Sequence, residues 1–386
     1  MDRPFPLRKF IAPEFVFGNG ARRLIARYIS NFSARKVLLV TDPGVVAAGW
    51  AGEAADAMKE SGIPFEIFSG VSSNPRDTEV MQGVGVFRDA QCDMIVAVGG
   101  GSPMDCAKGI GIAASNGGHI LDYEGIDLIP LPCPPLVCIP TTAGSSADVS
   151  QFAIITASGH RRKVAIVSKT LVPDGALIDP DTLTTLTPEL TAHTGMDALV
   201  HAVEAYVSTA SSPVSDLFAL EAIRLTATHL RDAAKNPADI GLHGKTMLAS
   251  LNAGLAFSNA SLGAVHAMAH SMGGLLDLPH GECNALLLCG VIDYNFEAVP
   301  QRYRKVASCL GIQTEGQSDS AVKAQLITAF RSLNAELGIS LHLGSVGFGK
   351  ESLTSLAAHA LNDACMATNP RIPTMEDLES IYAGLL

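Results

Sequence analysis

The sequence predicts an α/β domain followed by an all-helical domain, and three observations support this division. Strand-like and helix-like segments alternate up to about residue 178. From residue 189 onward, long segments rich in Ala, Leu and Glu are typical of helices, and strand signals nearly vanish. The chain has 386 residues, which exceeds the size at which one hydrophobic core usually keeps growing. We therefore expect one domain over residues 1–182 and a second over residues 183–386.

The first half of the chain has the order of repeated strand–helix–strand units. Short apolar runs predict strands, and the longer mixed segments between them predict helices. Because the strands are apolar throughout, we expect a parallel sheet with helices on both faces. The expected strands are 36–42, 65–68, 94–98, 136–140, 152–156, 164–167 and 176–178, and the expected helices are 45–61, 78–90, 103–114, 189–208, 214–234, 241–259 and 321–337.

The composition excludes several classes of protein. Hydrophobic residues make up 47% and charged residues 17%, which is typical of a well-buried globular protein. The net charge of −11 argues against a nucleic-acid partner, and no apolar run is long enough to predict a membrane span. Residues 1–10 lack the apolar segment of a signal peptide, and the eight cysteines are scattered without a Cys-x-x-Cys pair. We expect a cytoplasmic protein with reduced thiols.

A glycine-rich loop at residues 99–105 stands between an expected strand and an expected helix. Glycines let the backbone approach a diphosphate, and free N–H groups at a helix start attract an anion. Residues 140–146 end another strand with hydroxyls and glycine, which also suits phosphate or ribose contacts. The loop does not have the Gly-x-Gly-x-x-Gly spacing, so a structural strand-to-helix turn is the alternative.

Asp42 ends the first buried strand. A carboxylate there can accept hydrogen bonds from ribose hydroxyls and repel a 2′-phosphate, which favours NAD over NADP. An Asp in this position is also a common helix cap, and that role is the alternative.

A cluster of one aspartate and four histidines indicates a metal site. Asp197 and His201 are four residues apart, as are His266 and His270, so each pair lies on one face of a helix. His280 follows a proline and adds a fifth candidate. A carboxylate with several imidazoles suits Fe²⁺ or Zn²⁺. Spacing alone favours His266 and His270 as a chelating pair and leaves one candidate too many.

Together these motifs resemble the iron-containing (group III) alcohol dehydrogenases. The resemblance rests on residues 99–105, 140–144, 195–206, 266–284 and 368–371, in order along nearly the whole chain. It implies a dehydroquinate synthase-like fold with an N-terminal nucleotide-binding domain, an all-α C-terminal domain and the active site between them. It also implies that the metal ligands are Asp197, His201, His266 and His280, and that His270 stands beside the nicotinamide and relays protons.

The resemblance extends to the cofactor and substrate residues. Read alone, Lys163 is typical of a solvated turn because it follows two arginines, and the three substrate-pocket residues have core packing as their alternative. Relatives usually read Thr-Gly-Ser-Glu where this chain has residues 145–148, Ser-Ser-Ala-Asp, so the path of that loop is in question. The implied NAD contacts are Asp42, Asn74, Gly100, Gly101, Ser102, Asp105, Thr141, Thr142, Ser145 and Lys163, and the implied pocket residues are Phe152, Phe257 and Cys365.

The expected function is reversible hydride transfer between NAD(H) and a small primary alcohol or diol and its aldehyde, in class EC 1.1.1.- and most specifically EC 1.1.1.1. Iron is the expected metal, zinc an alternative, and NADP the less expected cofactor. A homodimer or larger homo-oligomer is expected from the resemblance. One rival is a dehydroquinate synthase-like lyase, which needs a basic cluster that the helical half lacks. The other is an inactive metal- and nucleotide-binding regulator.

Overall fold

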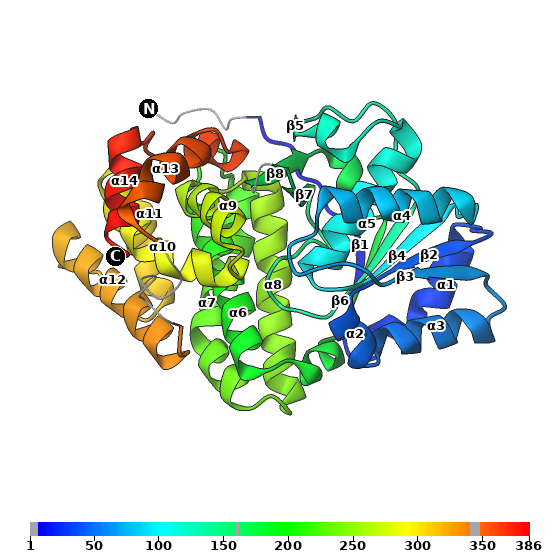
Figure 1. Ribbon diagram of the computed structural model, residues 1–386. Helices are drawn as coiled ribbons and strands as arrows, with labels where there is room; N and C mark the ends of the chain where they lie inside the picture. The colour runs from blue at the N-terminus through cyan, green and yellow to red at the C-terminus, as the bar shows by residue number, and fades with distance from the viewer. Residues whose placement is uncertain (1–6, 160–161, 340–347) are drawn as a thin grey trace.

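The computed structural model describes residues 7–159, 162–339 and 348–386. Residues 1–6 lie outside the described residues. They belong to residues 1–10, for which the sequence predicts no signal peptide. The chain forms an α/β part and a helical part that lie side by side (Figure 1). Strands give way to helices between residues 178 and 188. The predicted fold class is confirmed, whereas the boundary at residue 182 stays a prediction.

A six-stranded parallel sheet forms the centre of the α/β part. Its four inner strands are completely buried because helices cover both faces. The strands lie in the order β1 (Glu14–Phe17), β9 (Gly175–Ile178), β6 (Leu136–Pro140), β4 (Met94–Gly99), β2 (Val37–Val40) and β3 (Phe65–Phe68).

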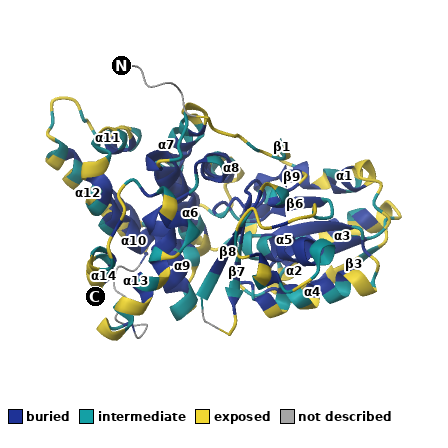
Figure 2. Cartoon of the chain, turned by 90° about the horizontal axis from the view of Figure 1, so that it is seen from above, coloured by how far each residue is buried: buried dark blue, intermediate teal, exposed yellow. Residues whose placement is uncertain are grey.

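Alternate residues of the strands pack on opposite helical layers. Leu38 and Val40 belong to the core beneath α4 (Asp77–Asp89) and α5 (Gly101–Asn116). The other side chains of β2 pack with α1 (Ile25–Asn31) and α3 (Trp50–Glu60). Figure 2 shows these strands buried between helices whose outer faces are intermediate or exposed.

Three features of this part differ from the expectation. The helix expected over 45–61 is two helices, α2 (Pro43–Ala47) and α3, because Gly49 adopts a left-handed φ of 90° between them. Strand β1 was not predicted. The strands expected at 152–156 and 164–167 form an antiparallel pair, β7 (Phe152–Ala157) and β8 (Arg162–Val167), in a separate sheet with β5 (Gly125–Ile126).

The helical part surrounds a second, larger core. The four helices expected there are present, and residues 188–339 and 348–386 contain five more α-helices. No helix among the described residues is long and apolar enough to cross a membrane. The helices are α6 (Pro188–Val207), α7 (Pro213–Lys235), α8 (Ile240–Ala260), α9 (Ala264–Leu276), α10 (His280–Asn295), α11 (Pro300–Cys309), α12 (Asp319–Glu336), α13 (Leu353–Leu361) and α14 (Met375–Ala383).

Candidate active site

A cavity of about 870 Å³ lies between the carboxyl ends of the sheet strands and the helical part. It brings together nearly all the residues singled out in the sequence. Within the described ranges, Cys365 does not line it, because its side chain is fully buried in the helical core. The lining includes Asp42, Asn74, Gly100, Gly101, Ser102, Asp105, Thr141, Thr142, Ser145, Phe152, Lys163, Asp197, His201, Phe257, His266, His270 and His280.

The glycine loop fits closely against the loop that follows β6. A Cβ atom on Gly100 would lie 3.1 Å from Oγ1 of Thr142, and one on Gly101 would lie 2.8 Å from Cβ of Ser145. A side chain at Gly101 would therefore require Ser145 to move, and one at Gly100 would be in tight contact with Thr142. Helix α5 begins at Gly101, two residues before the predicted start, and no described side chain caps its first N–H groups. Those groups are free to bind an anion.

Asp42 lines the cavity and caps a helix at the same time. Its Oδ1 accepts a hydrogen bond of 2.9 Å from the backbone N–H of Val45, at the start of α2. The cap that the sequence suggested is therefore present, and the role of Asp42 toward a ribose stays a prediction. Nearby, Asn74 donates to Asp277 and the hydroxyl of Ser102 donates to the carbonyl of Ser73.

Two ionisable side chains, Asp105 and Lys163, also line the cavity. Burial raises the pKa of Asp105 to about 6, against the opposing charges of Lys108 and Lys163. Its Oδ2 accepts from the backbone N–H of Ile154. Burial lowers the pKa of Lys163, which belongs to β8 and lines the cavity instead of a solvated turn.

Asp197 lies at the centre of the candidate metal site. Its Oδ1 is 3.9 Å from His201 Nδ1, 3.7 Å from His266 Nε2 and 3.9 Å from His280 Nε2. Asp197 and His201 stand one turn apart on α6, while α9 supplies His266 and α10 supplies His280. Ligands bound to one ion at about 2.0–2.2 Å lie at most about 4.4 Å apart, so these separations fit a shared ion.

The burial of this cluster adds a second test of the fit. His201 Nδ1 is buried and has no hydrogen-bond partner among the described residues. Burial lowers the pKa of His201 to about 3 and that of His280 well below its usual value, so both rings are neutral, as metal ligands must be. Burial would raise the pKa of Asp197, but the hydrogen bond and the charge of His266 oppose this effect and keep the carboxylate ionised. A carboxylate and neutral imidazoles suit a divalent ion.

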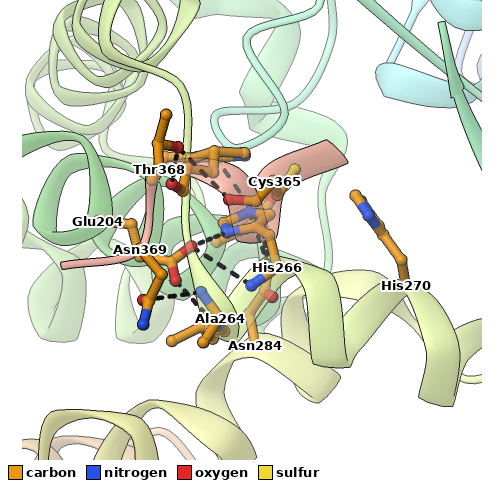
Figure 3. A network of polar contacts seen from close by, with 12 residues as sticks. Glu204, Ala264, His266, His270, Asn284, Cys365, Thr368 and Asn369 are labelled. Atoms are coloured by element: carbon orange, nitrogen blue, oxygen red, sulfur yellow. Dashed lines mark hydrogen bonds and ion pairs between the residues drawn. The ribbon is translucent and has the colours of Figure 1, made fainter. Parts of the chain in front are cut away.

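Two residues that the sequence analysis did not assign support this cluster. Glu204 lies two turns beyond Asp197 on α6, and its Oε2 accepts a hydrogen bond of 2.5 Å from Nδ1 of His266 (Figure 3). In the metal-free protein, burial lowers the pKa of His266, but Asp197 and Glu204 outweigh it and raise the value to about 9. Asn284 Nδ2 donates to Asp197 Oδ1 over 2.7 Å and lies 3.1 Å from Nε2 of His266. The seven-residue spacing of Asp197 and Glu204 is the signal that could have found the first of them.

His270 stands apart from the ligand atoms around Asp197. Its Nδ1 lies 2.8 Å from Oδ2 of Asp363, a residue that the sequence analysis did not single out. Its ring stacks on His280, with centroids 5.2 Å apart. The ligand atoms of His266 group with those of Asp197 and His201, whereas the ligand atoms of His270 group with those of Asp363 and Cys365. This arrangement does not favour the pairing of His266 with His270 that spacing alone suggested.

Two phenylalanines, Phe152 and Phe257, form an aromatic wall at the end of the cavity that contains Asp197. Phe257 stacks on the ring of His201 at 4.2 Å between centroids, and Phe152 lies 5.6 Å from Phe257. Both phenylalanines line the cavity. Their roles in a substrate pocket, and that of Cys365, stay predictions.

Ser146, which stands where relatives usually have glycine, adopts a backbone conformation that favours glycine. Its φ is 49°, in the left-handed region. The buried hydroxyl of Ser146 donates to the carbonyl of Ser250 over 2.7 Å. A Cβ on Gly254 would lie only 2.5 Å from Cβ of Ser146, so this glycine inside α8 makes room for the serine. The loop therefore holds Ser145 at the cavity despite the departure from the family pattern.

Comparisons with known proteins agree with this geometry. Residues 12–180 match the family described as iron-containing alcohol dehydrogenase, and residues 191–386 match the C-terminal part of the same family. The chain is 41% identical to 1,3-propanediol dehydrogenase of Klebsiella pneumoniae, over 95% of each chain. It is 37% identical to NAD-dependent methanol dehydrogenase of Bacillus methanolicus, over 98% of this chain and 99% of that one.

A solved structure shows the same likeness. The crystal structure of a 1,3-propanediol oxidoreductase superposes with a TM-score of 0.95 at 39% identity, over 99% of this chain and 100% of that chain. The resemblance inferred from the motifs is confirmed. The chain belongs to the iron-containing alcohol dehydrogenase family.

Proposed function

We propose that the protein catalyses reversible hydride transfer between NAD(H) and a small primary alcohol or diol and its aldehyde. The observation that carries this proposal is the position of the buried Asp197 cluster, which lines the same cavity as the glycine loop. Similarity to a methanol dehydrogenase that is NAD-dependent and to a 1,3-propanediol dehydrogenase supports the reaction and the cofactor. EC 1.1.1.1 is the specific class that we propose.

The ion is held by Asp197, His201, His266 and His280, and we assign it as Fe²⁺, with Zn²⁺ as the alternative for the same ligands. When bound, the ion polarises the substrate oxygen as a Lewis acid and the nicotinamide exchanges a hydride with the substrate carbon. The stacked Phe257 and the neighbouring Phe152 exclude water from this end of the cavity.

The opposite end of the cavity binds the cofactor. The free N–H groups at the start of α5 receive the diphosphate, with Gly100, Gly101 and Ser102 next to it. Asp42 accepts from the ribose, which selects NAD over NADP. Further contacts come from residues that line the same cavity, namely Asn74, Asp105, Thr141, Thr142, Ser145 and Lys163.

His270 holds and moves the proton. It lines the cavity next to His280, and imidazole exchanges protons near neutral pH. In alcohol oxidation the hydroxyl proton passes to this ring, and in aldehyde reduction it returns.

The charge of the cavity favours an uncharged substrate and disfavours the lyase. Release of phosphate from a sugar-like acid requires several cationic side chains in the cleft. Among the residues that the structure describes, Lys163 is the only lysine or arginine that lines the cavity. The aromatic wall likewise suits a small, neutral alcohol.

Three further assignments belong to the same proposal. We place the enzyme in the cytoplasm, because all eight cysteines are free. We assign it as a homodimer or larger homo-oligomer, and we place the domain boundary at residue 182.

The substitution His266→Ala tests the proposal. It should remove both the bound metal and the NADH formed from short alcohols, because His266 lies 3.7 Å from Asp197 and is fully buried. His359→Ala, at an exposed histidine of α13, is the matched control and should change neither. Turnover at the wild-type level in His266→Ala would refute the assignment. NAD binding without turnover of any alcohol or aldehyde in the wild-type chain would favour the inactive regulator.

A further inference from the structure

The carboxylate of Asp363 lies beside His270, the proposed proton carrier. Oδ2 of Asp363 lies 2.8 Å from Nδ1 of His270, and the Asp363 side chain is 9% exposed. Asp363 precedes the short helix η8 (Ala364–Thr368), 93 residues away along the chain. Figure 3 shows His270 one turn along α9 from His266, outside the hydrogen bonds that surround Glu204.

The two oxygens of Asp363 have different partners. Oδ1 accepts a hydrogen bond of 2.8 Å from the backbone N–H of Cys365 and caps η8, which leaves Oδ2 for His270. Burial would raise the pKa of Asp363, but His270 and the N–H of Cys365 outweigh it and lower the value. The carboxylate is therefore ionised and can only accept hydrogen bonds.

We propose that Asp363 is a positioning residue that holds His270 in the tautomer with hydrogen on Nδ1 and a lone pair on Nε2. The inference rests on the proposed function, in which His270 relays the proton. Because Oδ2 can only accept, Nδ1 must donate, and the hydrogen bond on one ring nitrogen fixes the state of the other. His270 Nε2 has no hydrogen-bond partner within the described part of the chain, and the ring lines the cavity.

The proton then has a defined destination during alcohol oxidation. The O–H bond of the alcohol breaks, its electron pair forms the carbonyl, and the proton binds to the lone pair of Nε2. The electrons of the C–H bond leave as the hydride that NAD⁺ accepts. The resulting imidazolium carries hydrogen on both nitrogens, and Asp363 stabilises its charge.

The substitution Asp363→Asn separates this role from helix capping. The amide oxygen can still accept from the N–H of Cys365, so η8 keeps its cap. The amide NH₂ group then faces Nδ1 of His270, which must become an acceptor, and the hydrogen moves to Nε2. A ring in that tautomer cannot accept the substrate proton.

A double-mutant cycle tests the coupling. Asp363→Asn should lower kcat by about 10²–10⁴-fold, the range of general acid–base catalysis, with metal content and the KM for NAD unchanged. In a His270→Ala background the same substitution should change kcat by less than about threefold. An equal loss in both backgrounds would show a structural role and overturn the inference. Wild-type kcat in Asp363→Asn, together with a slow His270→Ala, would also overturn it.

A spectroscopic measurement separates this inference from the proposed function. In the zinc-loaded full-length protein labelled with ¹⁵N-histidine, the signals absent from His270→Ala identify this ring. The wild type should show the Nδ1–H tautomer and Asp363→Asn the Nε2–H tautomer. If His270→Ala has wild-type turnover, the relay in the proposed function fails, and this comparison alone decides the role of Asp363. The same tautomer in both proteins would overturn the inference.

Discussion

The substitution Glu204→Gln is the most informative perturbation of the metal site. Oε1 of Glu204 accepts from the backbone N–H of Val265 over 2.7 Å, while Oε2 accepts from Nδ1–H of His266 over 2.5 Å. Glutamine has only one acceptor oxygen. In one orientation the NH₂ group of the glutamine faces the backbone N–H of Val265, which then has no acceptor. In the other orientation the NH₂ group faces Nδ1 of His266 and forces the tautomer in which Nε2 carries the hydrogen, and a protonated Nε2 cannot bind a metal.

The size of the effect follows from these contacts. Loss of a carboxylate that orients a ligating histidine weakens metal binding by about 10–100-fold, or roughly 1.4–2.7 kcal/mol. The metal-free protein should also lose about 1–3 kcal/mol of unfolding free energy, because a donor at the buried start of α9 is left without its acceptor.

Chelator competition measures the metal affinity, and urea unfolding of the metal-free protein measures its stability. Glu336→Gln removes a carboxylate that binds Arg231 at the surface of α12, and it serves as the matched control with no change in affinity. Metal affinity of Glu204→Gln within threefold of the wild type would refute the reasoning.

The remaining predictions concern the cofactor and the loop around it. The substitution Asp42→Ser keeps a side chain that can cap α2 but removes the negative charge. The ratio of kcat/KM for NADP to kcat/KM for NAD should therefore rise about tenfold, which corresponds to about 1.4 kcal/mol. An unchanged ratio in steady-state assays would contradict the role of Asp42. Gly254→Ala should lower the unfolding free energy by about 1–3 kcal/mol in urea, because its Cβ would lie 2.5 Å from Cβ of Ser146. Gly244→Ala, on the same helix with space around it, should stabilise by about 0.5–1 kcal/mol, and equal effects would contradict the argument. Burial raises the pKa of Asp148 to about 6, so its neutral form stabilises the fold below pH ~4 and that contribution is lost as the pH rises through 6. The unfolding free energy of Asp148→Asn relative to that of the wild type should therefore rise by about 2 kcal/mol between pH ~4.5 and pH ~7, as measured by urea unfolding. A difference that does not change with pH would show that the pKa of Asp148 is not raised.

Much of the fold could be predicted because buried parallel strands are apolar throughout and long helices have a clear composition. Strand β1 was missed since it is an edge strand with three of its four residues exposed. The break at Gly49 was missed because an isolated glycine inside a helical pattern is often tolerated. Nothing in their local sequence showed that β7 and β8 leave the parallel sheet, since strand pairing depends on residues distant along the chain.

The candidate site was predictable where residues repeat along one helix or end a strand. The pair on α6 and the glycine loop are local patterns of this kind. The partners of the site residues are different, because Asp363 lies 93 residues from His270 and only the fold brings them together. The same holds for Gly254, whose missing side chain is explained by the serine packed against it.

The measurement that tests the central claim most directly is NADH formation from a panel of short primary alcohols and diols by the full-length protein, with metal analysis of the same sample. The protein purified without oxygen should contain iron, lose turnover when a chelator removes the metal, and regain it when Fe²⁺ or Zn²⁺ is restored. Turnover that persists after complete removal of the metal would contradict the account, and so would a fully metal-loaded protein that forms NADH from none of these alcohols.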